Sequence, residues 1–321
     1  MMGWTAATEN PRASDPSRVG VVELARRFVA LSRLPHVALD IATPAMAALL
    51  WLGHFPPASV VLLGLFTAFA GYTTVYALND LVDHRVDREK MDADDTSHRR
   101  YLDAIGGRHP VAQGLVTRAQ GWIWIGAWDA LGIIGTFMLR PICMAIFLGG
   151  AALEALYCLL YRVTPLRALL SGVIKTLGGL AAVFTVDPHP DPQRLLILIS
   201  MVFFWEIGGQ NVPADWTDID EDKRMSARTV PVFLGAQWAA IVIMVCLCAA
   251  IGMSMAVLAI FPSRHGLASM AAALAAGGGL LVYPSVELLR TQERSRAQAV
   301  FNSASYYPLA LLAIVAFRTL V

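Results

Sequence analysis

The chain has 321 residues, of which 56% are hydrophobic and 15% are charged, and its formal net charge is +1. Soluble domains carry about 25% charged residues, so this composition, with a mean hydropathy of +0.56, excludes an ordinary soluble domain. The near-neutral charge gives no indication of a nucleic-acid partner. We therefore expect an integral membrane protein.

The N-terminal segment is polar. Residues 1–20 contain no apolar stretch of the kind found in a cleavable signal peptide. We expect residues 1–25 to be disordered and residues 26–321 to form a single transmembrane domain.

Apolar blocks long enough to cross a bilayer, about 20 residues each, recur nine times along the chain. They are too long for membrane β-strands, which are short and alternate in polarity. The sequence therefore predicts an all-α bundle of nine transmembrane helices, at residues 35–55, 58–78, 119–139, 142–161, 168–186, 195–214, 237–262, 267–289 and 299–317.

The positions of the basic residues predict the orientation. With a cytoplasmic N-terminus, 20 of the 25 Lys and Arg residues fall on the cytoplasmic side, and Lys175 lies inside the fifth span. Only four lie on the opposite side, at 140, 194, 264 and 318. The positive-inside rule then places the N-terminus in the cytoplasm and, after nine spans, the C-terminus on the other side.

Two long loops, 79–118 and 215–236, follow the second and sixth spans and so face the same side. Each begins with the pattern DxxDxxxD and then a basic residue. The two copies are offset by 135 residues at every aspartate, which suggests a duplicated four-helix unit plus one additional helix. The copies are Asp80, Asp83, Asp87 with Arg88, and Asp215, Asp218, Asp222 with Lys223.

The spacing of these acidic motifs places their carboxylates together. On a helix of 3.6 residues per turn, positions i, i+3 and i+7 share one face. If each span continues as a helix through its motif, it presents a negative stripe about 10 Å long. Such stripes can be solvated helix ends, but like charges on one face cost stability unless a cation neutralises them.

An all-oxygen cluster of carboxylates suits a hard divalent cation. Mg²⁺ is usually held by one or two carboxylates, with waters and substrate phosphates completing its shell. The two stripes therefore indicate a polyphosphate bound through Mg²⁺ between the second and sixth spans. A calcium-binding EF-hand loop beginning at Asp218 is excluded, because its sixth position is Lys223 and its twelfth is Thr229.

The sequence resembles the UbiA superfamily of intramembrane prenyltransferases from about residue 25 to 317. Asn79, Asp80, Asp83 and Asp87 match its NDxxDxxxD signature. The second acidic motif, followed by TVPVFLG at 229–235, is similar to its second signature. RHPVAQG at 108–114 and RLPHVALD at 33–40 are weaker matches.

The resemblance implies a central cavity capped by the two loops, in which Mg²⁺ on the acidic motifs binds a prenyl diphosphate. An isoprenoid chain would pass to a lipophilic acceptor, commonly an aromatic one such as a 4-hydroxybenzoate-like ring. Two alternatives are a membrane terpene cyclase, which needs no acceptor, and a transporter or channel. A transporter's charges belong near the bilayer midplane, whereas these motifs lie at span ends.

The candidate site residues follow from the two motifs and the basic residues around them. We expect metal binding by Asn79, Asp83, Asp87, Asp215, Asp218 and Asp222, with Asp80 as a further catalytic residue that binds or orients a neighbour. We expect the diphosphate to contact Arg88, Arg108, Arg167, Lys175, Lys223 and Arg228.

Four further acids, Asp40, Asp129, Glu154 and Glu206, lie inside apolar spans. Intramembrane acids are functional candidates, and we expect them to contact the acceptor or to pair with Lys175. The loop segment 88–108 is longer than the resemblance predicts. Ala214 also stands where relatives frequently carry Lys.

Overall fold

A computed structural model describes residues 20–84, 87–88, 109–261 and 266–320. Nine helices among these residues are long and apolar enough to cross a membrane, which confirms the predicted all-α, multi-pass architecture. They are Leu34–Leu52, Ala58–Val82, Arg118–Leu139, Pro141–Leu159, Arg167–Val186, Pro192–Thr217, Ala236–Ile260, Gly266–Thr291 and Arg294–Leu320.

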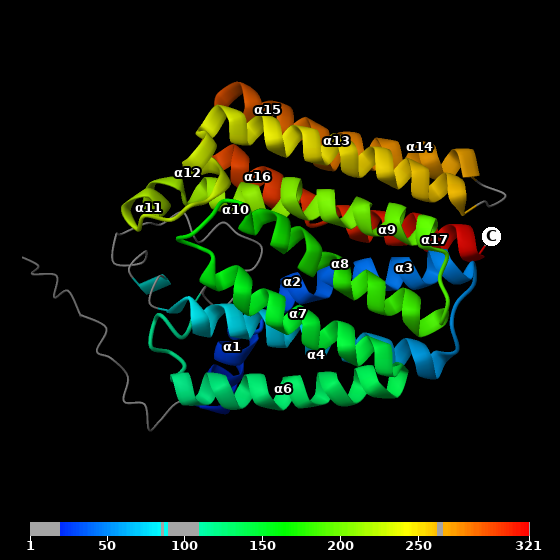
Figure 1. The fold of residues 1–321 in the computed structure, drawn as a ribbon, viewed down its shortest axis with the longest axis horizontal. Coiled ribbons are helices and arrows are strands. Elements are labelled where there is room, and N and C mark those ends of the chain that lie inside the picture. The colour runs from blue at the N-terminus through cyan, green and yellow to red at the C-terminus, as the bar shows by residue number, and fades with distance from the viewer. Residues whose placement is uncertain (1–19, 85–86, 89–108, 262–265, 321) are drawn as a thin grey trace, which may run out of the picture.

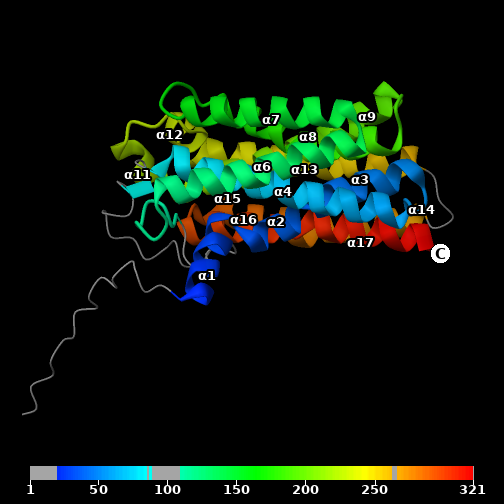
Figure 2. The same cartoon turned by 90° about the horizontal axis from the view of Figure 1, so that it is seen from below.

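The N-terminal half supplies five of these spans. A short helix, α1 (Val21–Leu31), precedes them, so helical structure begins inside the segment expected to be disordered. Figure 2 shows α1 lying at an angle to the bundle. The spans are α2 (Leu34–Asp40) with α3 (Ala42–Leu52), then α4 (Ala58–Val82), α6 (Arg118–Leu139), α7 (Pro141–Leu159) and α8 (Arg167–Val186).

The C-terminal half supplies four spans, three of them built from more than one element. The sixth is α9 (Pro192–Trp205), η4 (Glu206–Asn211) and α10 (Val212–Thr217), and the short helices α11 (Ile219–Arg224) and α12 (Val230–Leu234) follow it. The last three are α13 (Ala236–Ile260), then α14 (Gly266–Gly277), η5 (Gly278–Val282) and α15 (Tyr283–Thr291), then α16 (Arg294–Ala304) and α17 (Tyr307–Leu320).

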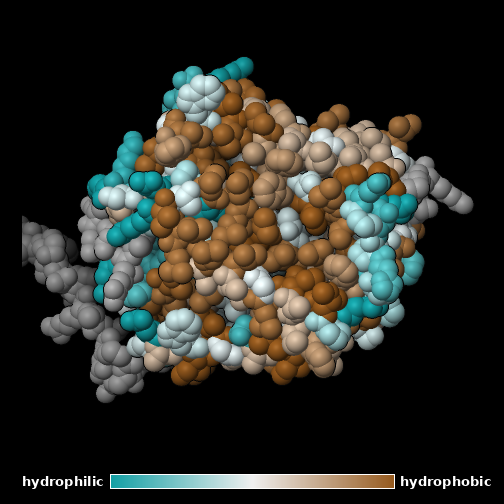
Figure 3. All heavy atoms as spheres, viewed as in Figure 1, coloured by the Kyte–Doolittle hydropathy of each residue, from teal (hydrophilic) through white to brown (hydrophobic). Residues whose placement is uncertain are grey.

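The ends of the spans carry sequence signals that start helices. Thr117 and Gln120 form a capping box at α6, in which each side chain bonds to the other's backbone N–H. Pro141 and Pro192 begin α7 and α9, where a missing N–H costs nothing. Between the ends the surface is apolar: Figure 3 shows a hydrophobic band across the middle of the bundle and hydrophilic side chains at both ends.

The helices pack so that both acidic motifs reach the same end of the bundle. Helix α4 packs on α6, both α3 and α7 pack on α8, and α9 packs on α13. Figures 1 and 2 show the C-terminal end of α4 at the same end as α10, α11 and α12. The ends of α4 and α10, which carry the two acidic motifs, therefore lie at the same end of the bundle.

The sixth span widens into a π-helical turn at η4 just before Pro213. A proline inside a helix has no N–H to donate and its ring clashes with the carbonyl four residues earlier, and a π turn relieves both problems. Gly208 lies in this turn, where a Cβ would come within 2.9 Å of the Ile243 carbonyl oxygen. A glycine here lets the turn approach α13 closely.

Candidate active site

The first acidic motif lies where α4 ends. Asn79 and Asp80 occupy its last turn, and Asp83 ends the helix with φ −86° and ψ 1°. A new turn begins there, because the Asp87 N–H donates to the Asp83 carbonyl at 2.9 Å. Asp80 is 2% exposed and accepts a hydrogen bond from the backbone N–H of Val111 at 3.3 Å.

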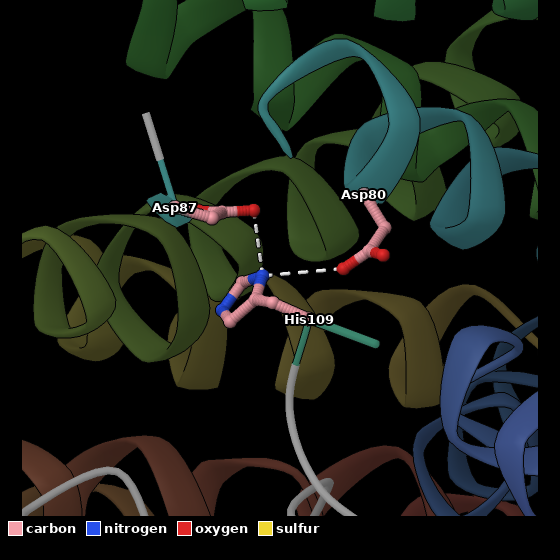
Figure 4. A group of neighbouring side chains, drawn as sticks. All are labelled: Asp80, Asp87 and His109. Atoms are coloured by element: carbon pink, nitrogen blue, oxygen red, sulfur yellow. Dashed lines mark ion pairs between the residues drawn. The ribbon is translucent and has the colours of Figure 1, made fainter. Parts of the chain in front are cut away.

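His109 joins two aspartates of this motif. Figure 4 shows its imidazole between them, with Nδ1 at 3.2 Å from Asp80 Oδ1 and 2.7 Å from Asp87 Oδ2. One ligand atom from each of the three residues lies within 4.8 Å of the others, a spacing that fits a metal ion. His109 also has a left-handed backbone, φ 56°, which is uncommon outside glycine.

Sequence analysis assigned no specific role to His109. In the RHPVAQG stretch the sequence analysis expected Arg108 to contact the diphosphate, and Arg108 lies outside the described residues. His109 lies inside this stretch, which resembles the family, and its place there is the one sequence signal that could have found it.

The second acidic motif lies where α10 ends. Arg167, at the start of α8, donates from Nη2 to Asp215 Oδ1 at 2.7 Å. The hydroxyl of Tyr161 donates to Asp222 Oδ1 at 2.6 Å. Asp215 is therefore positioned by the start of α8, and Asp222 by the segment that connects α7 to α8.

The two motifs have the same backbone break. Asp218 ends α10 with φ −105° and ψ 14°, as Asp83 ends α4, and its carbonyl accepts the Asp222 N–H at 2.7 Å. The unbroken helical stripe expected from the spacing is therefore wrong for both copies. Each helix ends at its middle aspartate, and the same break occurs in both copies, 135 residues apart.

The end of α7 lies between the motifs and contacts both. The amide of Asn79 lies 3.7 Å from Cys158 Sγ. The adjacent Tyr157 accepts a hydrogen bond from Asn211 at 2.8 Å, and its ring lies under the Arg167 guanidinium, 4.6 Å from the ring centroid. These contacts place both acidic segments around one region.

The other basic candidates lie near the motifs, with different environments. Arg88 donates from Nε to the Ala112 carbonyl at 3.2 Å. Lys223 and Arg228 are exposed on the segment after α10. Arg294, which the sequence reasoning missed, lies 3.7 Å from Asp218 Oδ1 and 3.6 Å from Glu221 Oε1. It belongs to no motif, so no sequence pattern indicated it.

A cavity of about 640 Å³ runs through the bundle below the motifs. Arg33, Asn79 and Ala214 line it near the acidic motifs, and Phe55 and Val60 line the opposite end. The intervening wall is mostly apolar and comes from α3, α4, α6, α7, α8 and α17. Such a cavity can hold a long apolar molecule.

Three of the four intramembrane acids are buried, at 2% exposed for Asp40 and 7% for Glu154 and Glu206. Lys175, expected to contact the diphosphate, places its ammonium 2.7 Å from Asp40 Oδ2 and 3.9 Å from Glu206 Oε2. The expected pairing of intramembrane acids with Lys175 is therefore observed. Asp129 is only partly buried and does not line the cavity.

The chemistry of the two motifs fits a hard divalent cation. They bring six carboxylates and the Asn79 amide to one end of the cavity, and oxygen ligands of this kind are those that Mg²⁺ prefers. Asn211 adds a buried amide oxygen that accepts no hydrogen bond from the described residues. His109 extends the donor set of the first motif to nitrogen.

The fold and site define a class: a multi-pass membrane protein with an apolar internal cavity capped at one end by paired acidic motifs. Residues 41–312 match the UbiA prenyltransferase family. The chain belongs to this family of membrane prenyltransferases.

Solved structures share the fold at low sequence identity. A UbiA homologue from Aeropyrum pernix K1 is 16% identical with a TM-score of 0.69, covering 88% of this chain and 97% of that one. A UbiA homologue from Archaeoglobus fulgidus bound to DMAPP and Mg²⁺ is 15% identical with a TM-score of 0.60, covering 89% and 99%.

Among characterised sequences, a 4-hydroxybenzoate octaprenyltransferase from Saccharophagus degradans is 24% identical over 217 residues. The alignment covers 67% of this chain and 66% of that relative.

Proposed function

We propose that the protein is a Mg²⁺-dependent prenyltransferase that moves an isoprenoid chain from a prenyl diphosphate to a lipophilic aromatic acceptor. The observation that carries this proposal is the pair of acidic motifs at the mouth of one apolar cavity. The relative from Archaeoglobus fulgidus bound to DMAPP and Mg²⁺ supports it, as does a second structure of that homologue bound to GPP and Mg²⁺.

The acidic motifs hold the metal ions in this proposal. Mg²⁺ supplies positive charge that stabilises the departing diphosphate. The ligands are Asn79, Asp83, Asp87, Asp215, Asp218 and Asp222, and Asp80 acts through His109, which it contacts at 3.2 Å.

The basic residues bind the diphosphate oxygens directly. Arg167 is the strongest candidate, because it is 5% exposed and its guanidinium already lies beside the second motif. Arg88, Arg108, Lys223 and Arg228 are further candidates from the two loops, which together cap the site. Positive charge placed beforehand around a leaving group needs little reorganisation during the reaction.

The reaction breaks the bond between the allylic carbon and the diphosphate oxygen, and the electron pair leaves with the diphosphate. A ring carbon of the acceptor forms the new bond and the ring then loses a proton. The apolar cavity excludes water, which would otherwise capture the allylic cation. By the positive-inside rule the site faces the cytoplasm.

The test is an assay of the purified full chain in lipid nanodiscs with Mg²⁺ and geranyl, farnesyl or geranylgeranyl diphosphate, with and without 4-hydroxybenzoate. Diphosphate release that requires the acceptor, together with a prenylated ring detected by mass spectrometry, supports transfer. A cyclic hydrocarbon formed without acceptor supports the terpene cyclase instead. No release under any condition contradicts both.

A further inference from the structure

A polar layer crosses the cavity wall below the acidic motifs. It consists of Asp40 on α2, Tyr76 on α4, Lys175 on α8 and Glu206 on η4. The Lys175 ammonium donates to Asp40 Oδ2 at 2.7 Å and to the Tyr76 hydroxyl at 3.3 Å, and the Tyr76 hydroxyl donates to the same carboxylate. Four separate helical segments therefore meet in this layer.

The depth of the layer separates it from the diphosphate site. Lys175 lies eight residues along α8 from Arg167, which contacts the second motif, and seven residues separate Tyr76 from Asp83. At 1.5 Å per residue these spacings place the layer about 10–12 Å below the motifs. A ring that attacks the carbon attached to the diphosphate would extend toward the layer.

Two carboxylates, Glu206 and Glu154, line the cavity near the single ammonium of Lys175. Asp40 and Glu206 share the ammonium of Lys175, which lies closer to Asp40. Glu154, on the facing helix α7, also lines the cavity and has Glu206 among its charged neighbours. Such a wall favours a ligand that donates a hydrogen bond and disfavours one that only accepts.

The π turn brings two polar residues, Glu206 and Asn211, to the cavity wall. On an α-helix, two residues five positions apart point in directions about 140° apart. Glu206 and Asn211 nevertheless both line the cavity, because the wider π turn η4 brings them closer to one face. The amide of Asn211 is 7% exposed and donates to Tyr157 at 2.8 Å. Its buried Oδ1 receives no hydrogen bond within the described part of the chain.

We propose that Glu206 binds a hydroxyl or amino substituent of the acceptor, and that Asp40 and Lys175 are positioning residues that hold Glu206 in place. The Ser171 hydroxyl fixes one oxygen, Oε1, by donating to it at 2.7 Å. The other oxygen, Oε2, is buried, lies 3.9 Å from the Lys175 ammonium and accepts no hydrogen bond from the described residues, so it is the oxygen that a ligand's donor would satisfy. The protein thereby selects an acceptor with a hydrogen-bond donor on the side away from the diphosphate. This inference rests on the proposed function.

The first experiment measures binding, which does not depend on turnover. Isothermal titration of the full chain in nanodiscs compares 4-hydroxybenzoate with 4-methoxybenzoate, which lacks the donor hydrogen. Wild type should bind the hydroxyl compound about tenfold more tightly, the effect of one hydrogen bond to a charged group. Glu206→Gln, whose amide can donate to the methoxy oxygen, should remove most of that preference. An unchanged preference in Glu206→Gln, or none in wild type, overturns the proposal.

The second experiment separates positioning from general damage. Asp40→Asn should raise the KM for the acceptor and leave the KM for the prenyl diphosphate within about twofold, whereas Asp40→Glu should restore part of the loss. The matched control is Asp129→Asn on α6, an intramembrane acid that does not line the cavity. Equal changes in both KM values overturn the positioning role. Wild-type protein that binds the hydroxyl compound selectively but transfers nothing contradicts the proposed function instead.

Discussion

Arg167 and Asp215 form a buried ion pair, Nη2 to Oδ1 at 2.7 Å, between the start of α8 and the second acidic motif. The guanidinium is also held against two aromatic rings, with its carbon 4.6 Å from the centroid of Tyr157 and 4.9 Å from that of Tyr161. The pair therefore has a fixed position beside the proposed diphosphate site before any substrate binds.

Replacing Arg167 should weaken transition-state stabilisation. We expect Arg167→Ala to lower kcat/KM for the prenyl diphosphate about 10²–10³-fold, the usual effect of removing one charged stabilising group. Arg167→Lys should lose less, because it keeps the charge but not the planar group that contacts both rings. Steady-state kinetics measure both. Arg290→Ala, on an exposed arginine of α15, is the control, and full activity of a folded Arg167→Ala protein would contradict the assignment.

The middle aspartates of the two motifs should be essential. Asp83→Ala and Asp218→Ala should each reduce turnover to the detection limit, because each removes a proposed metal ligand, while the protein still inserts and folds. The matched control is Asp220→Ala, which removes an exposed acid two residues after Asp218, in the first turn of α11. Circular dichroism verifies folding. Wild-type rates in either variant would remove the basis for placing metal at the motifs.

His109 should tune metal affinity. It contacts Asp80 and Asp87, so His109→Asn should raise the Mg²⁺ concentration for half-maximal activity about tenfold, in the range reported for residues that orient metal ligands. Asn is chosen because it tolerates the left-handed backbone. Activity is titrated with Mg²⁺ after removal of metal by chelation, with His54→Asn as control. An unchanged Mg²⁺ titration would show that His109 has no part in the metal site.

The close approach of η4 to α13 should depend on Gly208. A Cβ there would lie 2.8 Å from the Cβ of Cys246 and 2.9 Å from a backbone oxygen, so Gly208→Ala should destabilise the fold by about 1–3 kcal/mol. Gly252→Ala is the matched control on α13, where a Cβ meets nothing within 4 Å. Thermal unfolding in detergent compares them, and equal melting temperatures would contradict the close packing.

The stabilising contact between Trp51 and Asp187, just beyond the end of α8, should depend on pH. Asp187 accepts hydrogen bonds from Trp51 Nε1 at 2.7 Å and from the His189 backbone N–H at 2.9 Å, and these lower the pKa of its carboxyl below the usual value. A lowered pKa in the folded state gives stability that is present above the unfolded pKa, about 3.9, and is lost as pH falls through the folded pKa.

The melting-temperature difference between wild type and Trp51→Phe should therefore be largest near pH 7 and shrink as pH falls below about 4. A difference that grows toward acid pH would contradict this sign. Phe55→Leu, at an exposed residue near the same end of the bundle, serves as the control.

Much of the fold could be predicted from the sequence because the bilayer imposes a simple rule. A span needs about 20 apolar residues, so the nine predicted blocks agree with the nine helices to within a few residues at most ends. The common end of the two acidic motifs also followed from counting spans. The geometry of those motifs did not, because the middle aspartate of each copy ends a helix where periodicity predicted continuity.

Sequence alone determined the spans, the two acidic motifs and the family resemblance, since each depends on local composition or on spacing along the chain. Tertiary structure decided which distant side chains meet: His109 with Asp80 and Asp87, Arg294 with Asp218, and Lys175 with Asp40. Those partners lie up to 135 residues apart, and their contacts depend on helix rotation and on the π turn. Neither can be inferred from the order of residues, because both are set by how all nine helices pack together.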